Sequence, residues 1–303
     1  MSILQAIILG IVQGLTEFIP ISSTAHLVFA SRAVGLFSGA NPALKAEQTT
    51  AAIAVIQLGT LLAVLVYFSR DIINISRAFV VDHIALLTGR GSSASHQTNR
   101  VGITGKLSND AWLGWLVIIG SIPVGIVGLL FKKQIEGTFT KNLWVIATMM
   151  IVVAILLGIA EMVGRRTRSM ADLGVRDALA VGCAQVLALI PGSSRSGSTI
   201  MGGLFAGETR ETAARFSFLL SIPAIAASGL LELKEAFAKL PADSYMPLAV
   251  ATVVSGIVGY ASIWFLLRFL RTHSTGIFIG YRMIVGALII FALLAGYFSA
   301  DIA

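Results

Sequence analysis

Charge and cysteine are both scarce in this sequence. Only 12% of the 303 residues are charged, whereas a soluble domain has roughly 25%. The single cysteine, Cys183, excludes an internal disulfide, and no Cys-x-x-Cys pair or His/Cys cluster indicates a zinc or iron–sulfur site. The 22 lysines and arginines are spread without interleaved aromatic residues, so the net charge of +7 indicates membrane topology and no nucleic-acid partner.

Apolar residues dominate the chain instead. They make up 56% of it, and the mean hydropathy is +0.87, which predicts an all-α polytopic membrane protein. The first residues, Met1 to Gln5, lack the basic stretch of a cleavable signal peptide, so we expect the first apolar segment to remain in the mature protein. The longest polar region, about 70–110, predicts a loop, and its portion 89–100 has the composition of a flexible segment.

Apolar segments of two lengths alternate along the chain. Because a spanning helix needs about 20 apolar residues, six segments are long enough to cross a membrane: 50–68, 111–131, 142–163, 213–232, 246–267 and 277–298. Four shorter segments form two broken pairs: 3–18 with 24–37, interrupted at Pro20, and 177–191 with 200–206, interrupted at Pro191. A proline removes a backbone donor and breaks a helix, so each pair predicts a re-entrant hairpin.

The order of these segments repeats within what we expect to be one integral membrane domain, 1–303. Residues 1–163 and 164–303 each contain one broken hairpin followed by three transmembrane helices. An odd number of spans places the second half upside down relative to the first. The sequence therefore predicts an inverted-topology repeat, in which two broken elements meet near the middle of the membrane.

The distribution of basic residues indicates the orientation. With the N-terminus outside, 14 of the 22 lysines and arginines fall inside, including Arg282 of an expected inner loop 268–282, and 7 fall outside. This bias favours an outer N-terminus by the positive-inside rule. We expect the charged residues of the inner loops to form a solvated face, among them Glu208, Arg210, Glu211 and Arg215.

The first broken pair carries polar side chains that are costly at membrane depth. Its sequence is Gln13-Gly-Leu-Thr-Glu17-Phe-Ile-Pro20-Ile-Ser22-Ser23-Thr24-Ala-His26. An ionisable group there costs a few kcal/mol or more unless it is paired or lines a wet cavity, which makes it a candidate functional residue. Gln13 and Glu17 are four apart and share a helix face. The carboxylate could hold a hard cation or act as a general base.

The residues after the break have two readings each. The hydroxyls of Ser22, Ser23 and Thr24 could cap the second half-helix, whose N-terminus would also attract phosphate. His26 follows Ser22 by four residues and Ser23 by three, so its ring can face either hydroxyl. A structural role in packing remains the alternative for both Glu17 and His26.

The second broken pair contains Pro191-Gly192-Ser193-Ser194-Arg195-Ser196-Gly-Ser-Thr199, which repeats Pro-x-Ser-Ser at an offset of 171 residues. Glycine lets the backbone approach a ligand, successive N–H groups bind anions, and arginine matches phosphate oxygens. The stretch has no lysine and is not a Walker A loop. An ion pair between Arg195 and Glu17 is the alternative role for the arginine. Together the two stretches suit phosphoryl transfer from a lipid-borne phosphate.

These residues resemble the two signatures of the undecaprenyl-diphosphate phosphatases, the bacitracin-resistance family. The segment 13–27 is similar to the first signature and 191–199 to the second. Three further similarities are Ile56-Gln57-Leu-Gly-Thr, Phe216-Ser-Phe-Leu-Leu-Ser-Ile-Pro223 and Gly280-Tyr-Arg282. The likeness extends over nearly the whole chain, except that much of 88–108 has no family counterpart and is interpreted as an inserted loop.

The resemblance implies hydrolysis of undecaprenyl (C55 polyprenyl) diphosphate to the monophosphate and inorganic phosphate. This reaction recycles the lipid carrier of peptidoglycan synthesis and confers bacitracin resistance. The resemblance also implies a multi-pass protein of the bacterial inner membrane, a site open to its outer face and a divalent cation, Mg²⁺ or Ca²⁺. The oligomeric state is left open, with a homodimer as one candidate.

Roles are carried over by position. Glu17 matches the essential acidic residue, which is also the expected metal ligand, and Arg195 matches the phosphate-binding arginine. Ser23 and His26 match the proposed nucleophile or acid/base positions, and which of them attacks, or whether water does, stays open. The expected substrate-binding residues are Gln13, Ser22, Thr24, Gly192, Ser193, Ser194, Ser196 and Thr199. Some family members have a carboxylate at the position of Gln13, so a metal here would rely more on phosphate and water oxygens.

Two other functions fit parts of the sequence. A transporter or flippase for a phosphorylated lipid would also use inverted repeats with broken helices. The set of Glu17, Ser23 and His26 favours an enzyme, because binding an anion requires no nucleophile. An ion channel is less consistent with the sequence, since no segment offers a repeated filter.

Overall fold

The computed structural model describes residues 1–37, 42–88, 107–135 and 142–300, and within these residues all regular secondary structure elements are helices. The predicted insertion 88–108 lies almost entirely outside the described residues. In chain order the helices are α1 (Ile3–Phe18), α2 (Ser23–Ala33), α3 (Pro42–Tyr67), α4 (Ser69–Leu87), α5 (Asn109–Leu130), α6 (Lys132–Ile135), α7 (Leu143–Val163), α8 (Val175–Val186), α9 (Arg195–Phe205), α10 (Arg210–Lys239), α11 (Tyr245–Leu270) and α12 (Gly276–Leu294).

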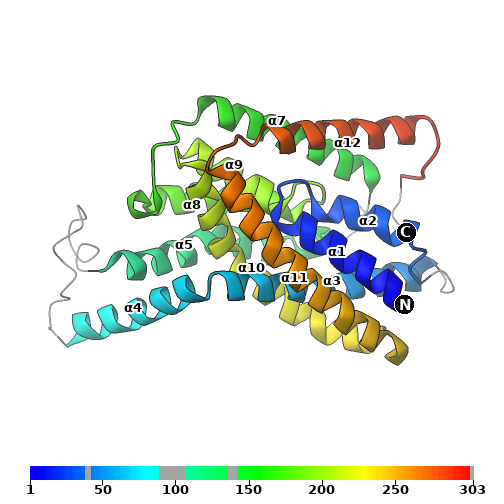
Figure 1. The fold of residues 1–303 in the computed structure, drawn as a ribbon, viewed down its shortest axis with the longest axis horizontal. Coiled ribbons are helices and arrows are strands. Elements are labelled where there is room, and N and C mark those ends of the chain that lie inside the picture. The colour runs from blue at the N-terminus through cyan, green and yellow to red at the C-terminus, as the bar shows by residue number, and fades with distance from the viewer. Residues whose placement is uncertain (38–41, 89–106, 136–141, 301–303) are drawn as a thin grey trace.

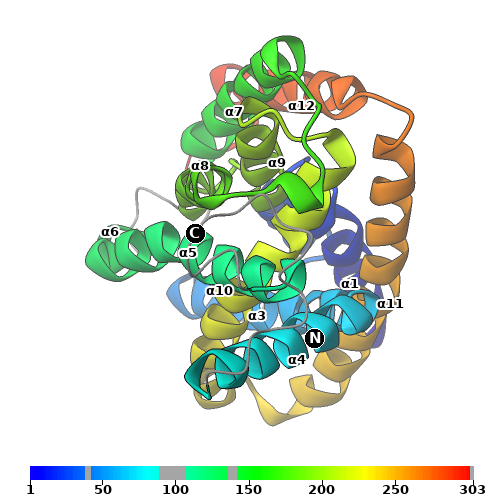
Figure 2. The same ribbon diagram turned by 90° about the vertical axis from the view of Figure 1, so that its left-hand side faces the viewer.

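In the described part of the chain, six helices are long and apolar enough to cross a membrane: α3, α5, α7, α10, α11 and α12. They coincide with the six predicted spans, which confirms an all-helical, multi-pass membrane protein. The short helices α1, α2, α8 and α9 correspond to the two broken pairs. In Figure 1, α7 and α12 lie side by side along the top, whereas α1, α3 and α11 are gathered below them. Figure 2 shows the same bundle from its end, with α11 along one edge.

Glycines let several helices approach one another closely. A Cβ on Gly14 of α1 would lie 2.8 Å from the Ser255 carbonyl oxygen of α11, and one on Gly182 of α8 would lie 2.2 Å from the Gly120 oxygen of α5. Small residues are the usual means of close helix contact in membranes, where water supplies no hydrophobic driving force between helices. The short helices that carry the broken pairs are thus fixed against the spanning helices.

The prediction of a polar loop over 70–110 was wrong for its first half. Residues 69–87 form α4, which packs along α5. The rings of Phe79, His83 and Trp115 pack against one another in tilted arrangements, and Trp115 Nε1 donates to His83 Nε2 at 3.0 Å. The charged residues of α4 lower its mean hydropathy, so the segment resembles a polar loop in sequence. Its apolar residues form one helix face, which is stabilised by packing against α5.

The expected solvated inner face was also wrong in part. Glu208 is 0% exposed, and Arg282 is fully buried within α12, so it does not belong to an inner loop. Glu211 does reach the surface, where it accepts from Arg271 at 2.8 Å. Arg215 pairs with Asp71 at 3.2 Å, and Arg210 pairs with Glu161 of α7.

Candidate active site

The first break in the chain brings Glu17, near the end of α1, close to Ser23, at the start of α2. α1 ends at Phe18, because Ile19 is extended and Pro20 cannot continue the helix. Phe18 is buried edge-to-face against Phe218 of α10, with ring centroids 5.4 Å apart, and this contact fixes the last turn that carries Glu17. Ser22 then adopts φ 78° and its Oγ accepts from the Ala25 N–H, so that α2 begins at Ser23.

The second break has the same local structure. Ser194 adopts φ 68°, and its Oγ accepts from the Gly197 N–H at 3.2 Å. α9 therefore begins at Arg195, five residues earlier than the predicted returning segment at 200. Gly192 has φ 94°, and a Cβ there would lie 2.2 Å from the Ile146 oxygen, so this position requires glycine.

The two breaks correspond in space with a register different from that of the sequence pattern. The Pro-x-Ser-Ser match aligns Ser22 with Ser193, at an offset of 171. The capping residues align Ser22 with Ser194, at an offset of 172. By this register Ser23 and Arg195 both occupy the first position of a helix, and both approach Glu17.

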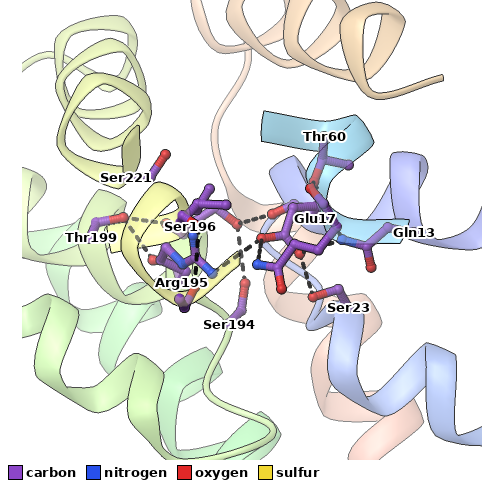
Figure 3. A network of polar contacts seen from close by, with 12 residues as sticks. Gln13, Glu17, Ser23, Thr60, Ser194, Arg195, Ser196, Thr199 and Ser221 are labelled. Atoms are coloured by element: carbon purple, nitrogen blue, oxygen red, sulfur yellow. Dashed lines mark hydrogen bonds and ion pairs between the residues drawn. The ribbon is translucent and has the colours of Figure 1, made fainter. Parts of the chain in front are cut away.

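Glu17 lies at the centre of the contacts between the breaks (Figure 3). Its Oε2 accepts from Ser23 Oγ at 2.8 Å and from Gln13 Nε2 at 3.1 Å. Its Oε1 accepts from Gln57 Nε2 at 3.4 Å and pairs with Arg195 Nη2 at 3.5 Å. Only 7% of the Glu17 side chain is exposed to solvent. Protein donors from four helices, α1, α2, α3 and α9, stabilise its charge in place of water.

The backbone joins the breaks as well. Ser196 Oγ donates to the Glu17 carbonyl oxygen at 3.4 Å and lies 3.1 Å from Ser194 Oγ. The expected alternative for Arg195, an ion pair with Glu17, is therefore observed. The pair leaves Arg195 Nη1 without a hydrogen-bond partner among the described residues, and the same holds for Gln13 Oε1.

A cavity of about 170 Å³ opens beside this cluster. Its polar lining consists of Gln13, Glu17, Ser23, Thr24, Gln57, Gly192, Ser194 and Arg195. Its apolar lining consists of Leu27, Val28, Ile53, Ala188 and Ile190. The N-termini of α2 and α9 both reach this cavity, because Ser23 and Arg195 are their first residues. One polar and one apolar wall suit the junction between a phosphate and a hydrocarbon chain.

His26 does not join this cluster. Its Nδ1 bonds the Ser22 carbonyl oxygen at 2.7 Å, and its Nε2 bonds the Tyr281 hydroxyl at 2.6 Å. Because a carbonyl only accepts, Nδ1 carries the proton of the neutral ring and Nε2 accepts from Tyr281. The expectation that His26 faces the Ser22 or Ser23 hydroxyl was wrong, since the first-turn geometry directs the ring to the backbone and to α12.

Four other residues from the predicted set lie near the cavity without lining it. Ser22 and Ser193 are buried, at 1% and 0% exposure, and Ser22 is used as a cap. Thr199 Oγ1 donates to the Arg195 carbonyl at 2.7 Å and contacts Ser217 of α10. Ser196 bonds the other break, as described above. These side chains support the backbone around the cavity.

Two residues of α3, named in the sequence analysis only within a family similarity, belong to the site. Gln57 donates to Glu17, and Thr60 Oγ1 lies 3.5 Å from Gln13 Nε2 while donating to the Gln57 carbonyl at 2.7 Å. A pair of polar side chains three residues apart inside an apolar span was the available signal, because such residues face a cavity or a partner.

The oxygen atoms around Glu17 fit a hard divalent cation in part. Glu17 supplies a carboxylate and Gln13 supplies Oε1, a buried amide oxygen with no partner. Oxygen donors of this kind are those that Mg²⁺ and Ca²⁺ prefer. No group of three His, Cys, Asp or Glu side chains suited to a metal occurs in the described part of the chain. These two residues could therefore bind a cation that phosphate and water oxygens also coordinate.

A second, larger groove of about 340 Å³ lies between α4, α5 and α10. Of the described residues that line it, Ser76 alone has a polar side chain, among apolar residues such as Ile72, Phe79 and Leu219. The described lining of this groove offers no charged group to a phosphate, so the smaller polar cavity is the candidate active site.

The fold and the site together define a class: multi-pass membrane proteins whose buried polar site lies between two broken helical hairpins. More specifically, the chain belongs to the family described as "Bacitracin resistance protein BacA", whose sequence profile matches residues 6–288.

Several curated proteins are similar to this chain over nearly its full length. A protein of Syntrophobacter fumaroxidans named "Undecaprenyl-diphosphatase" is 51% identical over 286 residues, which cover 94% of this chain and 95% of that protein. Proteins of the same name from Mycolicibacterium gilvum and Chloroherpeton thalassium are 46% and 45% identical, and each match covers 99% of this chain and 100% of the relative.

Proposed function

We propose that this protein is a membrane phosphatase that hydrolyses undecaprenyl diphosphate to undecaprenyl phosphate and inorganic phosphate. Family membership and the printed name of its relatives support this substrate. The observation that carries the reaction is the contact of Ser23, Glu17 and Arg195 in one cavity with an apolar wall. In the cell this reaction returns the carrier lipid to peptidoglycan synthesis, and it accounts for the bacitracin resistance after which the family is named.

The geometry supports Ser23 as the nucleophile. Its Oγ donates to Glu17 Oε2 at 2.8 Å, which is the arrangement of a nucleophile and its general base. Ser23 Oγ attacks the terminal phosphorus, its proton passes to Glu17, and the bond from that phosphorus to the bridging oxygen breaks. The bridging oxygen keeps the electron pair, so polyprenyl phosphate leaves. Water then attacks the phosphoserine phosphorus, and the bond from that phosphorus to Ser23 Oγ breaks. Glu17 returns its proton to Ser23 Oγ, and inorganic phosphate leaves with the protons of the water.

Arg195 and the helix N-termini stabilise the negative charge. Arg195 Nη1 has no hydrogen-bond partner among the described residues, so it can bond a phosphate oxygen while Nη2 stays near Glu17. The first N–H groups of α2 and α9 add partial positive charge at the same cavity. His26 acts from outside the cavity, since both of its ring nitrogens are bonded elsewhere.

A divalent cation is the expected cofactor, and Glu17 with Gln13 Oε1 would hold it. When bound, it would neutralise phosphate charge and orient the terminal phosphate. Gln13 contributes no charge of its own, so the cation would bind more weakly without a phosphate than at a site with two carboxylates.

The inverted repeat predicted from the sequence is part of this proposal, with halves 1–163 and 164–303. Three spanning helices in each half and a serine cap with positive φ at each break support it. We also propose an outer N-terminus and a site that opens to the outer face of the bacterial plasma membrane. After Arg282 is removed from the inner group, 13 basic residues inside against 7 outside still favour this orientation.

Phosphate release from detergent-solubilised protein tests the function. The substrate is a long-chain polyprenyl diphosphate, assayed with Mg²⁺, with Ca²⁺ and with chelator. We expect cation-dependent release that is lost in Glu17→Ala and Arg195→Ala, and kept in Arg268→Ala, a change at an exposed arginine of α11. A folded protein that binds the lipid and releases no phosphate would instead support a carrier for phosphorylated lipids.

A further inference from the structure

Arg282 of α12 is the largest side chain that is fully buried in the described part of the chain. A buried guanidinium ordinarily has a carboxylate partner, because an unpaired charge at low dielectric is costly. Among the described residues no acidic side chain forms an ion pair with Arg282. All of its bonds go to backbone carbonyl oxygens instead.

These carbonyls come from both breaks and from α7. Arg282 Nη2 donates to Gly192 O and Ser193 O, each at 3.0 Å, and these belong to the second break. Nη1 lies 3.5 Å from Pro20 O of the first break. Nε and Nη2 also bond the carbonyls of two methionines in the middle of α7, at 3.1 and 3.2 Å. One side chain thus links three separate segments.

The neighbouring residue bonds the first break by another route. The Tyr281 hydroxyl bonds His26 Nε2 at 2.6 Å, and the two rings stack with centroids 5.6 Å apart. The other nitrogen of His26 bonds the carbonyl of Ser22, the capping residue of α2. Tyr281 therefore fixes the position of the α2 N-terminus through His26.

The Arg282 charge also lies close to the start of α9. A Cβ added to Gly197, in the first turn of α9, would be 3.2 Å from Arg282 Nη1 and 3.2 Å from Ser194 Cβ. The absence of a side chain at Gly197 lets the guanidinium lie directly behind this turn. Since no described carboxylate neutralises it, its field adds to that of the two helix N-termini.

We propose that Tyr281 and Arg282, together called the α12 clamp, are positioning residues for the phosphatase reaction. The clamp holds the two breaks in the register that brings Ser23 and Arg195 to Glu17, and Arg282 adds positive potential behind the diphosphate. Neither residue touches the substrate, because neither lines the cavity. This inference rests on the proposed function, in that the breaks it positions are those of the proposed active site.

The principal test is Arg282→Lys, which keeps the charge but loses the planar fork. A single ammonium has three donors and cannot span Pro20, Gly192 and the α7 carbonyls together. A misplacement of about 1 Å can lower catalysis by about 100-fold, so we expect kcat to fall by that order while KM changes by less than about threefold. Tyr281→Phe loses one hydrogen bond and keeps the stacking, so we expect a smaller fall in kcat, about fivefold.

Hydrogen–deuterium exchange gives a readout that does not depend on activity. In Arg282→Lys we expect faster exchange at 19–26 and 190–198, with exchange in the other helices and the melting temperature close to those of the unchanged protein. Arg268→Lys, the same substitution at an exposed arginine, should change neither exchange nor kcat.

Three results separate the outcomes. Wild-type kcat in Arg282→Lys, or unchanged exchange at the breaks, would overturn the clamp. If the loss of activity in Arg282→Lys merely matches the fraction of unfolded protein, Tyr281→Phe, a change at a half-exposed position, decides instead: an unchanged kcat in that variant would overturn the clamp. If the unchanged protein releases no phosphate, the proposed function fails, while the exchange experiment still decides whether the clamp orders the breaks.

Discussion

Replacing Glu17 with glutamine should have opposite effects on binding and on catalysis. The carboxylate lies 3.5 Å from Arg195 Nη2 and competes with any anion for that guanidinium. At an effective dielectric constant of about 20, two unit charges at this distance attract by about 5 kcal/mol before desolvation. A phosphate oxygen about 5 Å from Glu17 would be repelled by about 3 kcal/mol on the same basis.

Without metal, Glu17→Gln therefore removes both a competitor and a repulsive charge. If about 1.4 kcal/mol of this electrostatic difference remains after the cost of desolvation is subtracted, inorganic diphosphate binds about tenfold more tightly to the variant. Phosphate release from the lipid should fall by about 100-fold to 10,000-fold, because Ser23 loses its general base. With Mg²⁺ the sign reverses, since Glu17 is the only carboxylate among the described residues that line the cavity, and its loss removes the charge that would hold the cation.

Calorimetric titration of inorganic diphosphate, with chelator and then with Mg²⁺, measures both effects on the same preparation. Glu211→Gln is the control, because this acid bonds Arg271 at the surface and is not among the residues that line the cavity. Weaker binding by Glu17→Gln in chelator would refute the electrostatic reasoning. Equal enhancement by Mg²⁺ in both proteins would show that Glu17 does not hold the cation.

Three further predictions concern the nucleophile, the packing and the buried acid. Ser23→Ala should abolish incorporation of phosphate into the protein during turnover, as mass spectrometry of quenched reactions would reveal, whereas Ser22→Ala should keep it and lower the melting temperature by the loss of one cap. Absence of phosphate on Ser23 in both the unchanged protein and Ser22→Ala would favour direct attack by water. Gly182→Ala places a methyl group 2.2 Å from the Gly120 carbonyl, so it should lower the melting temperature, with Gly125→Ala, whose added Cβ meets nothing within 4 Å, as the control. Burial and nearby Asp177 raise the pKa of Glu208 to about 8, from 4.5; the folded state then binds a proton that the unfolded state releases, and stability falls by about 1.4 kcal/mol per unit as the pH rises between these values. Glu208→Gln should flatten the melting temperature across this range and raise it at pH 7, in contrast to Glu211→Gln, and an unchanged pH dependence would refute a protonated Glu208.

The candidate site was predictable to the extent that its chemistry is unusual for a membrane segment. Glu17, Ser23 and Arg195 stood out because hydroxyls and charges are costly in hydrocarbon, and the structure brings these three together. His26 stood out for the same reason but faces Tyr281, because a ring in the first turn of a helix can bond the preceding carbonyl instead of a hydroxyl.

The fold, too, has features that the sequence determined and features that depend on tertiary contacts. The sequence by itself determined the six spanning helices and the two broken pairs, because the bilayer imposes length and hydropathy and proline interrupts a helix locally. It could not determine α4, the burial of Glu208 or the position of Arg282, since each depends on residues far away in the chain. Only the tertiary structure decided that Arg282 meets Pro20 and Gly192. The carbonyls that it bonds exist in every residue, so no sequence pattern could mark them as its partners.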